Sequence, residues 1–167
     1  MAQGSDAGSV FMCFGSLPGD AQAPGQISKS PASGGWIRLL SCQWSGSINY
    51  GARSADGVSD AADASPVVIT KVTDSSSTGL LRQAILGDFR NSAVIVFIRT
   101  GSGGKPDEYL RLELENCGIV DFGIANHDGE RSTETYTIQY GAMDVRSFSF
   151  EGASQRNQVS YTIVNQG

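Results

Sequence analysis

The feature that most constrains the fold of this chain is a two-residue alternation of apolar and polar side chains. It is clearest in residues 109–115, where three leucines face one way and charged side chains face the other. Successive side chains of a β-strand point to opposite faces of a sheet, so this period predicts half-buried strands. Other segments with strand character are residues 9–14, 36–45, 67–73, 93–100, 117–124, 133–140, 142–150 and 159–164. Roughly eight or nine strands joined mostly by short turns predict an antiparallel sandwich or small barrel.

One short segment has helical spacing instead. The hydroxyl side chains of Ser76, Ser77 and Thr78 suit a helix N-terminus, and Gly87 supplies a stop. Between them lies an apolar stripe formed by Leu80, Leu81, Ala84 and Ile85. A helix of about ten residues needs tertiary packing to persist, so we expect it to cover one end of the sheet structure. The run at 93–100, "AVIVFIRT", is apolar throughout and predicts a strand buried on both faces.

The bulk composition indicates a single domain over residues 1–167 and excludes several kinds of partner. The net charge is −5, and no Lys and Arg cluster stands out, so neither nucleic acid nor an acidic membrane surface is an expected partner. No apolar run approaches the roughly 20 residues of a spanning helix, and the first residues lack a secretory signal. We therefore expect synthesis in the cytoplasm and no membrane insertion. An odd number of cysteines, Cys13, Cys42 and Cys117, favours reduced core thiols.

Residues that carry chemistry are scarce, and we expect no catalytic residue, no cofactor and no metal. The single histidine, His127, lies in an Asn-His-Asp-Gly turn, which is a poor place to hold a catalytic base. No CxxC pair occurs, and "GSGGK" at 101–105 lacks the spacing of a phosphate loop. The neighbouring Glu113 and Glu115, with Arg111, predict ordinary charge pairing on a wet face. The aromatic side chains expected in the core are Trp36, Trp44, Phe97, Tyr136 and Phe148.

A long segment of small and polar residues, 46–64, interrupts the strands. Loops of this length in a compact domain are usually functional or disordered. We therefore treat residues 46–64 as an extended loop or arm, and residues 151–167 as a C-terminal strand or tail.

Several motifs follow one another in a distinctive order. "GGWIRLLSCQW" is a tryptophan-containing strand segment that precedes a long glycine- and serine-rich segment. "VVITKVTDSSSTGLLRQAILG" then combines a strand, an Asp-Ser/Thr turn and a short helix, and "AVIVFIRT", "EYLRLELENCGIVDF" and "ETYTIQYGAMDVRSFSF" follow. This ordered set resembles the haemolysin-coregulated protein (Hcp) family, whose members form the tube of bacterial type VI secretion, and the resemblance covers roughly residues 8–150.

The resemblance implies two packed antiparallel sheets forming a β-barrel with a short α-helix on its flank. It implies a structural subunit rather than an enzyme, assembled as a homohexameric ring that stacks into a hollow tube. The implied partners are a spike protein (VgrG), a contractile sheath and small secreted effectors, and the implied route is export through the type VI machine. In this picture the arm contacts another copy, and its candidate interface residues are Ile48, Asn49, Tyr50, Arg53 and Asp56.

Three other functions remain open at the level of sequence. A phage-type tail tube protein would share the fold. A monomeric β-barrel module that binds a small apolar ligand or a glycan would share the aromatic strands. A hydrolase on a β scaffold would have to rely on carboxylates.

Overall fold

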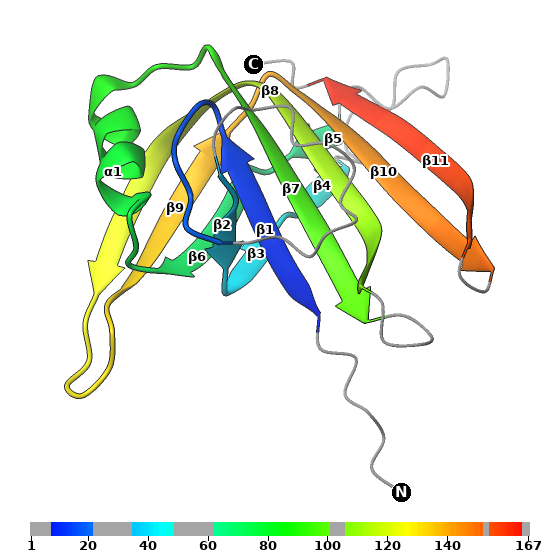
Figure 1. Ribbon diagram of the computed structural model, residues 1–167. Coiled ribbons are helices and arrows are strands. Elements are labelled where there is room, and N and C mark those ends of the chain that lie inside the picture. Colours follow the sequence, from blue (N-terminus) through cyan, green and yellow to red (C-terminus); the bar gives the residue numbers. More distant parts are fainter. Residues whose placement is uncertain (1–7, 22–34, 49–61, 101–105, 152–153, 165–167) are drawn as a thin grey trace, which may run out of the picture.

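The computed structural model describes residues 8–21, 35–48, 62–100, 106–151 and 154–164, in places by the backbone alone (Figure 1). These residues form a mainly β fold with one short helix, which confirms the fold class predicted from the sequence. The strands are β1 (Ser9–Phe14), β2 (Ile37–Leu39), β3 (Ser41–Gln43), β4 (Gly46–Ile48), β5 (Ala62–Ala64), β6 (Val67–Val72), β7 (Asn91–Thr100), β8 (Pro106–Ala125), β9 (Thr133–Gln139), β10 (Ala142–Glu151) and β11 (Ser154–Val164). The helix, α1, spans Ser77–Leu86.

The main sheet contains nine strands, and every pairing in it is antiparallel. Its central path runs β2-β1-β7-β8-β9-β6-β3, and the β10–β11 hairpin joins it through β8. The hydrogen-bonded ladder is not closed into a cylinder, because β2 and β3 at its two ends do not pair with each other. These two strands are nevertheless consecutive in the chain and separated only by Leu40. The sheet therefore turns back on itself through this connection rather than through another ladder.

The strand predicted across residues 36–45 is broken at Leu40, which differs from the sequence expectation. Before the break, β2 pairs with β1, and after it β3 pairs with β6. The Leu40 N–H donates to the carbonyl oxygen of Thr70 at 2.7 Å, and the Leu40 side chain is exposed. The chain bends here because it must leave one side of the barrel for the other.

β8 is one twenty-residue strand rather than the two strands predicted on either side of Asn116. Asn116 has a φ of 49°, a left-handed conformation that asparagine tolerates better than most residues. Before this kink β8 lies between β7 and β10, and after it β8 pairs with β9. The predicted break is therefore a bend that carries one strand from the first set of pairings to the second.

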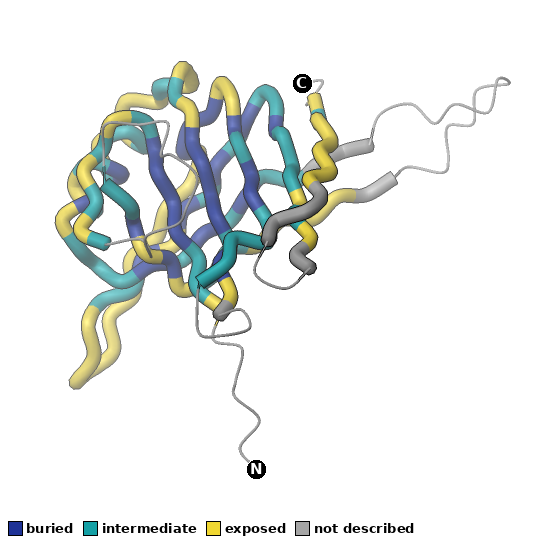
Figure 2. The backbone as a smooth tube through the Cα atoms, turned by 45° about the vertical axis from the view of Figure 1, so that its right-hand side comes forward, coloured by how far each residue is buried: buried dark blue, intermediate teal, exposed yellow. Residues whose placement is uncertain are grey.

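The core lies inside the curved sheet and extends to a second, smaller cluster on the outer face of β1 and β7. Ala93 and Ile95 face the interior, whereas Val94, Val96 and Ile98 belong to the outer cluster with Phe11. Both sets of β7 side chains are buried, which confirms the prediction for this apolar run. Figure 2 shows the buried residues concentrated in the central strands.

α1 packs against the core mainly through Leu80 and exposes one residue of the predicted stripe. Leu80 is fully buried and Ala84 is partly buried, but Ile85 is exposed, contrary to the sequence expectation. The helix ends as predicted: Gly87 has a φ of 62°, and its N–H donates to the carbonyl of Gln83 at 3.1 Å. The N-terminal serines do not cap the helix with a side-chain hydrogen bond, because they bond to the preceding turn instead.

A close contact at Gly118 gives a test of this packing. A Cβ atom at Gly118 would lie 2.8 Å from the Phe89 ring and 2.9 Å from the Asp88 carbonyl oxygen. Gly118→Ala should therefore lower the free energy of unfolding by about 1–3 kcal/mol, measured by urea denaturation. Gly123→Ala is the matched control, because the same strand leaves that position open and the change should stay within about 0.5 kcal/mol. Equal stability of both variants would contradict the packing.

Candidate functional site

The residues predicted to form a subunit interface fall on the arm, and the structure describes only its base. β4 and β5 pair antiparallel from Gly46 opposite Ala64 to Ile48 opposite Ala62. Ile48 thus lies at the far end of this small hairpin. The other four predicted interface residues, Asn49, Tyr50, Arg53 and Asp56, lie outside the described residues.

A chain of hydrogen bonds fixes the base of the arm to the barrel. The Trp44 indole N–H donates to the Tyr140 hydroxyl at 2.8 Å, and that hydroxyl donates to the Ser65 carbonyl at 3.1 Å. The Ser65 hydroxyl in turn donates to the Ser45 carbonyl at 2.6 Å. The two ends of the arm are therefore held together and against the residue that follows β9.

The five predicted core aromatic residues differ in their positions. Tyr136 is buried, whereas Trp36 and Phe97 are half-buried against the outer and inner clusters respectively. Phe148 is half-buried in β10. Trp44 is not a core residue, since 37% of it is exposed beside the arm, where its indole N–H finds a polar partner.

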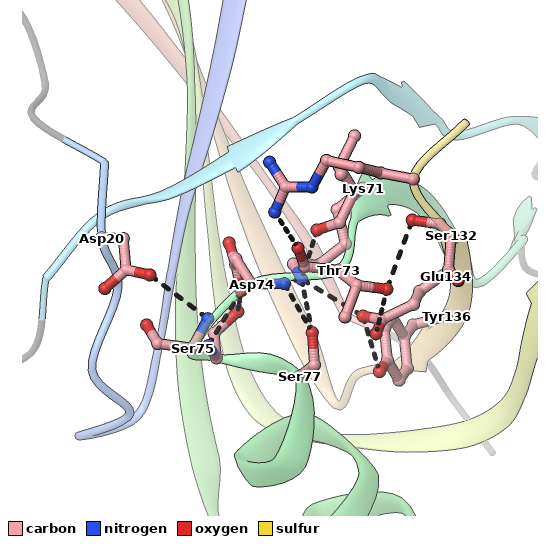
Figure 3. A network of polar contacts seen from close by, with 12 residues as sticks. Asp20, Lys71, Thr73, Asp74, Ser75, Ser77, Ser132, Glu134 and Tyr136 are labelled. Atoms are coloured by element: carbon pink, nitrogen blue, oxygen red, sulfur yellow. Dashed lines mark hydrogen bonds and ion pairs between the residues drawn. The ribbon is translucent and has the colours of Figure 1, made fainter. Parts of the chain in front are cut away.

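An ion pair that was not predicted from the sequence lies inside the barrel (Figure 3). Lys71 of β6 is fully buried, and its ammonium lies 3.2 Å from Glu134 Oε2 of β9 and 2.9 Å from Asp74 Oδ1. It also donates to the Val72 carbonyl at 2.9 Å and to the Ser77 hydroxyl at 3.1 Å. An ammonium in such a dry place requires this full set of acceptors.

Glu134 is held from three directions. Its Oε2 accepts from Lys71 and from the Tyr136 hydroxyl at 3.1 Å, and its Oε1 lies 3.1 Å from the Thr73 hydroxyl. Burial, together with the charge of Glu134 and its hydrogen bond, raises the pKa of Tyr136. The tyrosine therefore stays protonated and remains a donor to the carboxylate.

Asp74 connects this buried pair to the start of α1. Burial by itself would raise the pKa of Asp74, but hydrogen bonds from Ser76 and Lys71 and the Lys71 charge outweigh it and lower the pKa. The Ser77 hydroxyl accepts the Asp74 N–H at 2.9 Å while it also binds Lys71. The network therefore fixes the helix to β6 and β9 together.

A signal for this network was present in the sequence. The alternation of residues 133–140 places Glu134 on the same face as Tyr136, Ile138 and Tyr140, all of which are buried. Likewise, Lys71 shares the buried face of β6 with Val67 and Ile69. Opposite charges on the apolar faces of two strands indicate a buried pair, provided that the strands are adjacent.

A second set of charges lies on the outer face of β8 and β10. Arg111 pairs with Glu108 at 3.3 Å and with Glu113 at 2.7 Å. On β10, Arg146 pairs with Glu113 at 3.1 Å and with Asp144 at 2.6 Å. We call Arg111, Glu113, Asp144 and Arg146 the charge ladder. The predicted charge pairing is present between Arg111 and Glu113, and Glu115 is exposed, but the expected wet face is wrong at Arg111, which is buried.

The thiols and the histidine show no arrangement for catalysis. Cys13 and Cys117 are buried and Cys42 is partly buried, and all three are reduced thiols. Burial raises the pKa of Cys42 to about 11 and that of Cys117 to about 12, so neither thiol forms a nucleophilic thiolate near neutral pH. His127 is exposed in the turn between β8 and β9.

Two features are absent from the parts of the chain that the structure describes. In these parts, no three His, Cys, Asp or Glu side chains group as a metal site would require. Within the same parts, no helix has the length and apolar character needed to cross a membrane.

Comparison with known proteins gives one family match and many structural matches. The family model described as "Type VI secretion system effector, Hcp" matches residues 15–159. No curated protein sequence matches the chain.

The structural matches are close in fold and distant in sequence. The fold is similar to Hcp1 from Salmonella typhimurium, with a TM-score of 0.71, 15% identity and 95% of each chain covered. It is also similar to secreted protein Hcp3 from Pseudomonas aeruginosa, with a TM-score of 0.68, 18% identity, and 96% of this chain and 100% of that chain covered. A mutant of Hcp1 from E. coli EAEC 042 gives a TM-score of 0.65 at 20% identity, covering 93% of this chain and 97% of that chain.

Removing the buried ammonium tests the ion pair. Lys71→Met leaves Glu134 uncompensated in the interior, so the free energy of unfolding should fall by about 3–5 kcal/mol in urea denaturation. Glu134→Gln alone should also destabilise the protein. The loss of unfolding free energy in the double variant should be about 1–3 kcal/mol smaller than the sum of the losses in the two single variants. Strictly additive effects would show that the two groups do not interact.

The lowered pKa of Asp74 predicts a pH dependence. A carboxyl group with a lower pKa in the folded state stabilises the protein above its unfolded pKa and loses this effect as the pH falls through the folded value. Asp74→Asn should therefore cost about 1 kcal/mol at pH 7, because the carboxylate is partly solvated. The difference from the wild type should shrink as the pH falls below the ordinary value of 3.8. Asp121→Asn, at an exposed position in β8, is the control. If the difference in stability between Asp74→Asn and the wild type stays constant with pH, Asp74 is not the group responsible.

Proposed function

Because the chain belongs to the Hcp family of the type VI secretion system, we propose that six copies close into a ring and that these rings stack into a hollow tube. The observation that carries the proposal is the family match over residues 15–159, together with a fold shared over nearly the full length of several Hcp structures. Hcp proteins are tube proteins of this machine, and the machine secretes them. The ring, the stacking and the cargo are the proposed part.

A structural role fits the way polar groups are used in the described residues. The interior charges of Lys71 and Glu134 are paired with each other and with hydroxyl groups. Such a network fixes the relative positions of β6, β9 and α1, and its polar groups are occupied by one another. We therefore propose that the protein acts through its shape and surfaces rather than as an enzyme.

We propose that the charge ladder lines the bore of the tube. Its two cations and two anions form ion pairs, and the side chains of Glu113, Asp144 and Arg146 are between 23% and 34% exposed. A hydrophilic lining with paired charges produces only a weak net field, because neighbouring charges cancel at a distance. Small effectors of either sign of charge would then pass along the bore without being retained.

The arm is proposed to reach a neighbouring copy. Hydrogen bonds through Trp44, Tyr140 and Ser65 fix the arm where it leaves the barrel. In the assembled tube, a spike protein and a contractile sheath are the proposed further partners. A phage-type tail tube has the same geometric requirements, and the neighbouring genes distinguish the two machines.

The arm can be removed at a defined point. Ser47 and Asp63 are paired across β4 and β5, so residues 48–62 can be replaced by Asn-Gly, the dipeptide preferred in two-residue hairpin turns. The full-length protein should scatter light as a multiple of 17.6 kDa near six, and at high concentration it should form tubes visible by negative-stain microscopy. The shortened variant should retain the fold and the ring but lose the tubes.

The outcomes separate the two parts of the proposal. Tubes formed by the shortened variant would reject the arm as the stacking element while leaving the ring intact. A full-length protein that stays monomeric at every concentration would reject the ring. That result would favour a monomeric ligand- or glycan-binding module instead.

A further inference from the structure

The apolar inner face of the sheet continues past the part that the barrel covers. Leu112 and Leu114 of β8 and Met143 of β10 are buried on this face, and Val145 is half-buried beside them. β11 extends the same face by one strand, because its residues are in register with β10. The face thus runs from the core into solvent through mostly apolar side chains, with Ser147 as an exposed polar residue on it.

The exposed end of this face is formed by β11. Val159, Tyr161 and Ile163 lie opposite Ser147, Val145 and Met143 of β10, and directly paired residues share one face. Tyr161 is 72% exposed and Val159 is 66% exposed. Within the described strands, β11 is hydrogen-bonded to β10 alone, and none of these strands pairs with its outer edge. We call Val145, Val159, Tyr161 and Ile163 the β11 face.

A second exposed apolar surface lies at the end of α1. Ile85 is 71% exposed, and Leu86 and Phe89 beside it are also exposed. Figure 1 shows α1 and β11 on opposite sides of the molecule. We call Ile85, Leu86 and Phe89 the α1 surface.

We propose that the β11 face of one copy docks on the α1 surface of the next copy, and that this contact builds the ring. The inference rests on the proposed function and specifies the surfaces that it uses. Two different surfaces on opposite sides of one chain produce a head-to-tail contact, which repeats until the rotation closes. A single self-complementary patch would produce a two-fold dimer instead.

Charge favours a second copy as the occupant of the β11 face. Each chain carries a net charge of −5, so two copies repel each other except where uncharged surfaces meet. The residues of the β11 face and of the α1 surface are uncharged, and the Asp88 and Arg90 side chains that flank Phe89 are paired with each other. Both are apolar surfaces that gain from leaving water, and both lie away from the charge ladder on the opposite face of β8 and β10.

Cysteine cross-linking tests the contact directly. We would make Tyr161→Cys and Ile85→Cys as separate variants, mix them, and treat the assembled protein with a short bismaleimide. The yield of covalent dimer from the mixture should be at least about tenfold the yield from either variant alone. A head-to-tail contact brings the two different surfaces together, whereas either variant alone carries only one of the two cysteines. The native thiols provide a low background, since Cys13 and Cys117 are buried and Cys42 is partly buried.

Val164 supplies a matched control. It is 64% exposed on the same strand as Tyr161 but points to the opposite face. Val164→Cys mixed with Ile85→Cys should give only the background yield. Wild-type protein treated with the same reagent sets that background.

Three outcomes would overturn the proposed contact between the β11 face and the α1 surface. Equal yields with Tyr161→Cys and Val164→Cys, in protein that light scattering shows to be a ring, would overturn the contact and leave the proposed ring intact. Efficient cross-linking of Tyr161→Cys with itself would replace the head-to-tail contact by a two-fold one. Wild-type protein that remains monomeric would overturn both the contact and the proposed function.

Discussion

β8 is the strand on which the arrangement of the barrel depends, because it carries hydrogen bonds to three other strands. Its first part is held between β7 and β10, and beyond Asn116 its second part pairs with β9. A backbone conformation at one residue, a φ of 49°, therefore directs the chain from one set of pairings to the other. The hairpin of β10 and β11, the buried core and the charge ladder all take their positions from this strand.

Inside the barrel, the polar side chains hold secondary-structure elements in position rather than take part in a reaction. Lys71 brings together acceptors from β6, β9 and the start of α1, so a short helix that packs through Leu80 also gains a polar attachment. Buried ion pairs add little net stability when they form, but removing one partner is costly. Such a network favours one relative placement of these elements over its alternatives.

On the surface, unlike in the interior, paired charges and unpaired apolar side chains occupy separate regions. Charges on the outer face of β8 and β10 are arranged in pairs, whereas apolar side chains remain exposed at β11 and at the end of α1. A monomeric enzyme would gain nothing from the exposed apolar side chains at β11 and α1, since such side chains are a cost in water. In a subunit that contacts identical copies on two sides, the paired charges and the exposed apolar side chains both have a use.

The alternation of side chains indicated most of the strands of this protein, the apolar face of each strand and the mainly β class, and the order of its motifs indicated the family. It also placed Lys71 and Glu134 on apolar faces, yet it did not show that they meet, because they are 63 residues apart and only the pairing of β6 with β9 joins them. The bend at Leu40, the exposure of Trp44 and the burial of Arg111 were likewise decided by tertiary structure. A local period fixes which way a side chain points within its strand, but whether that side faces water depends on the distant strands that cover it.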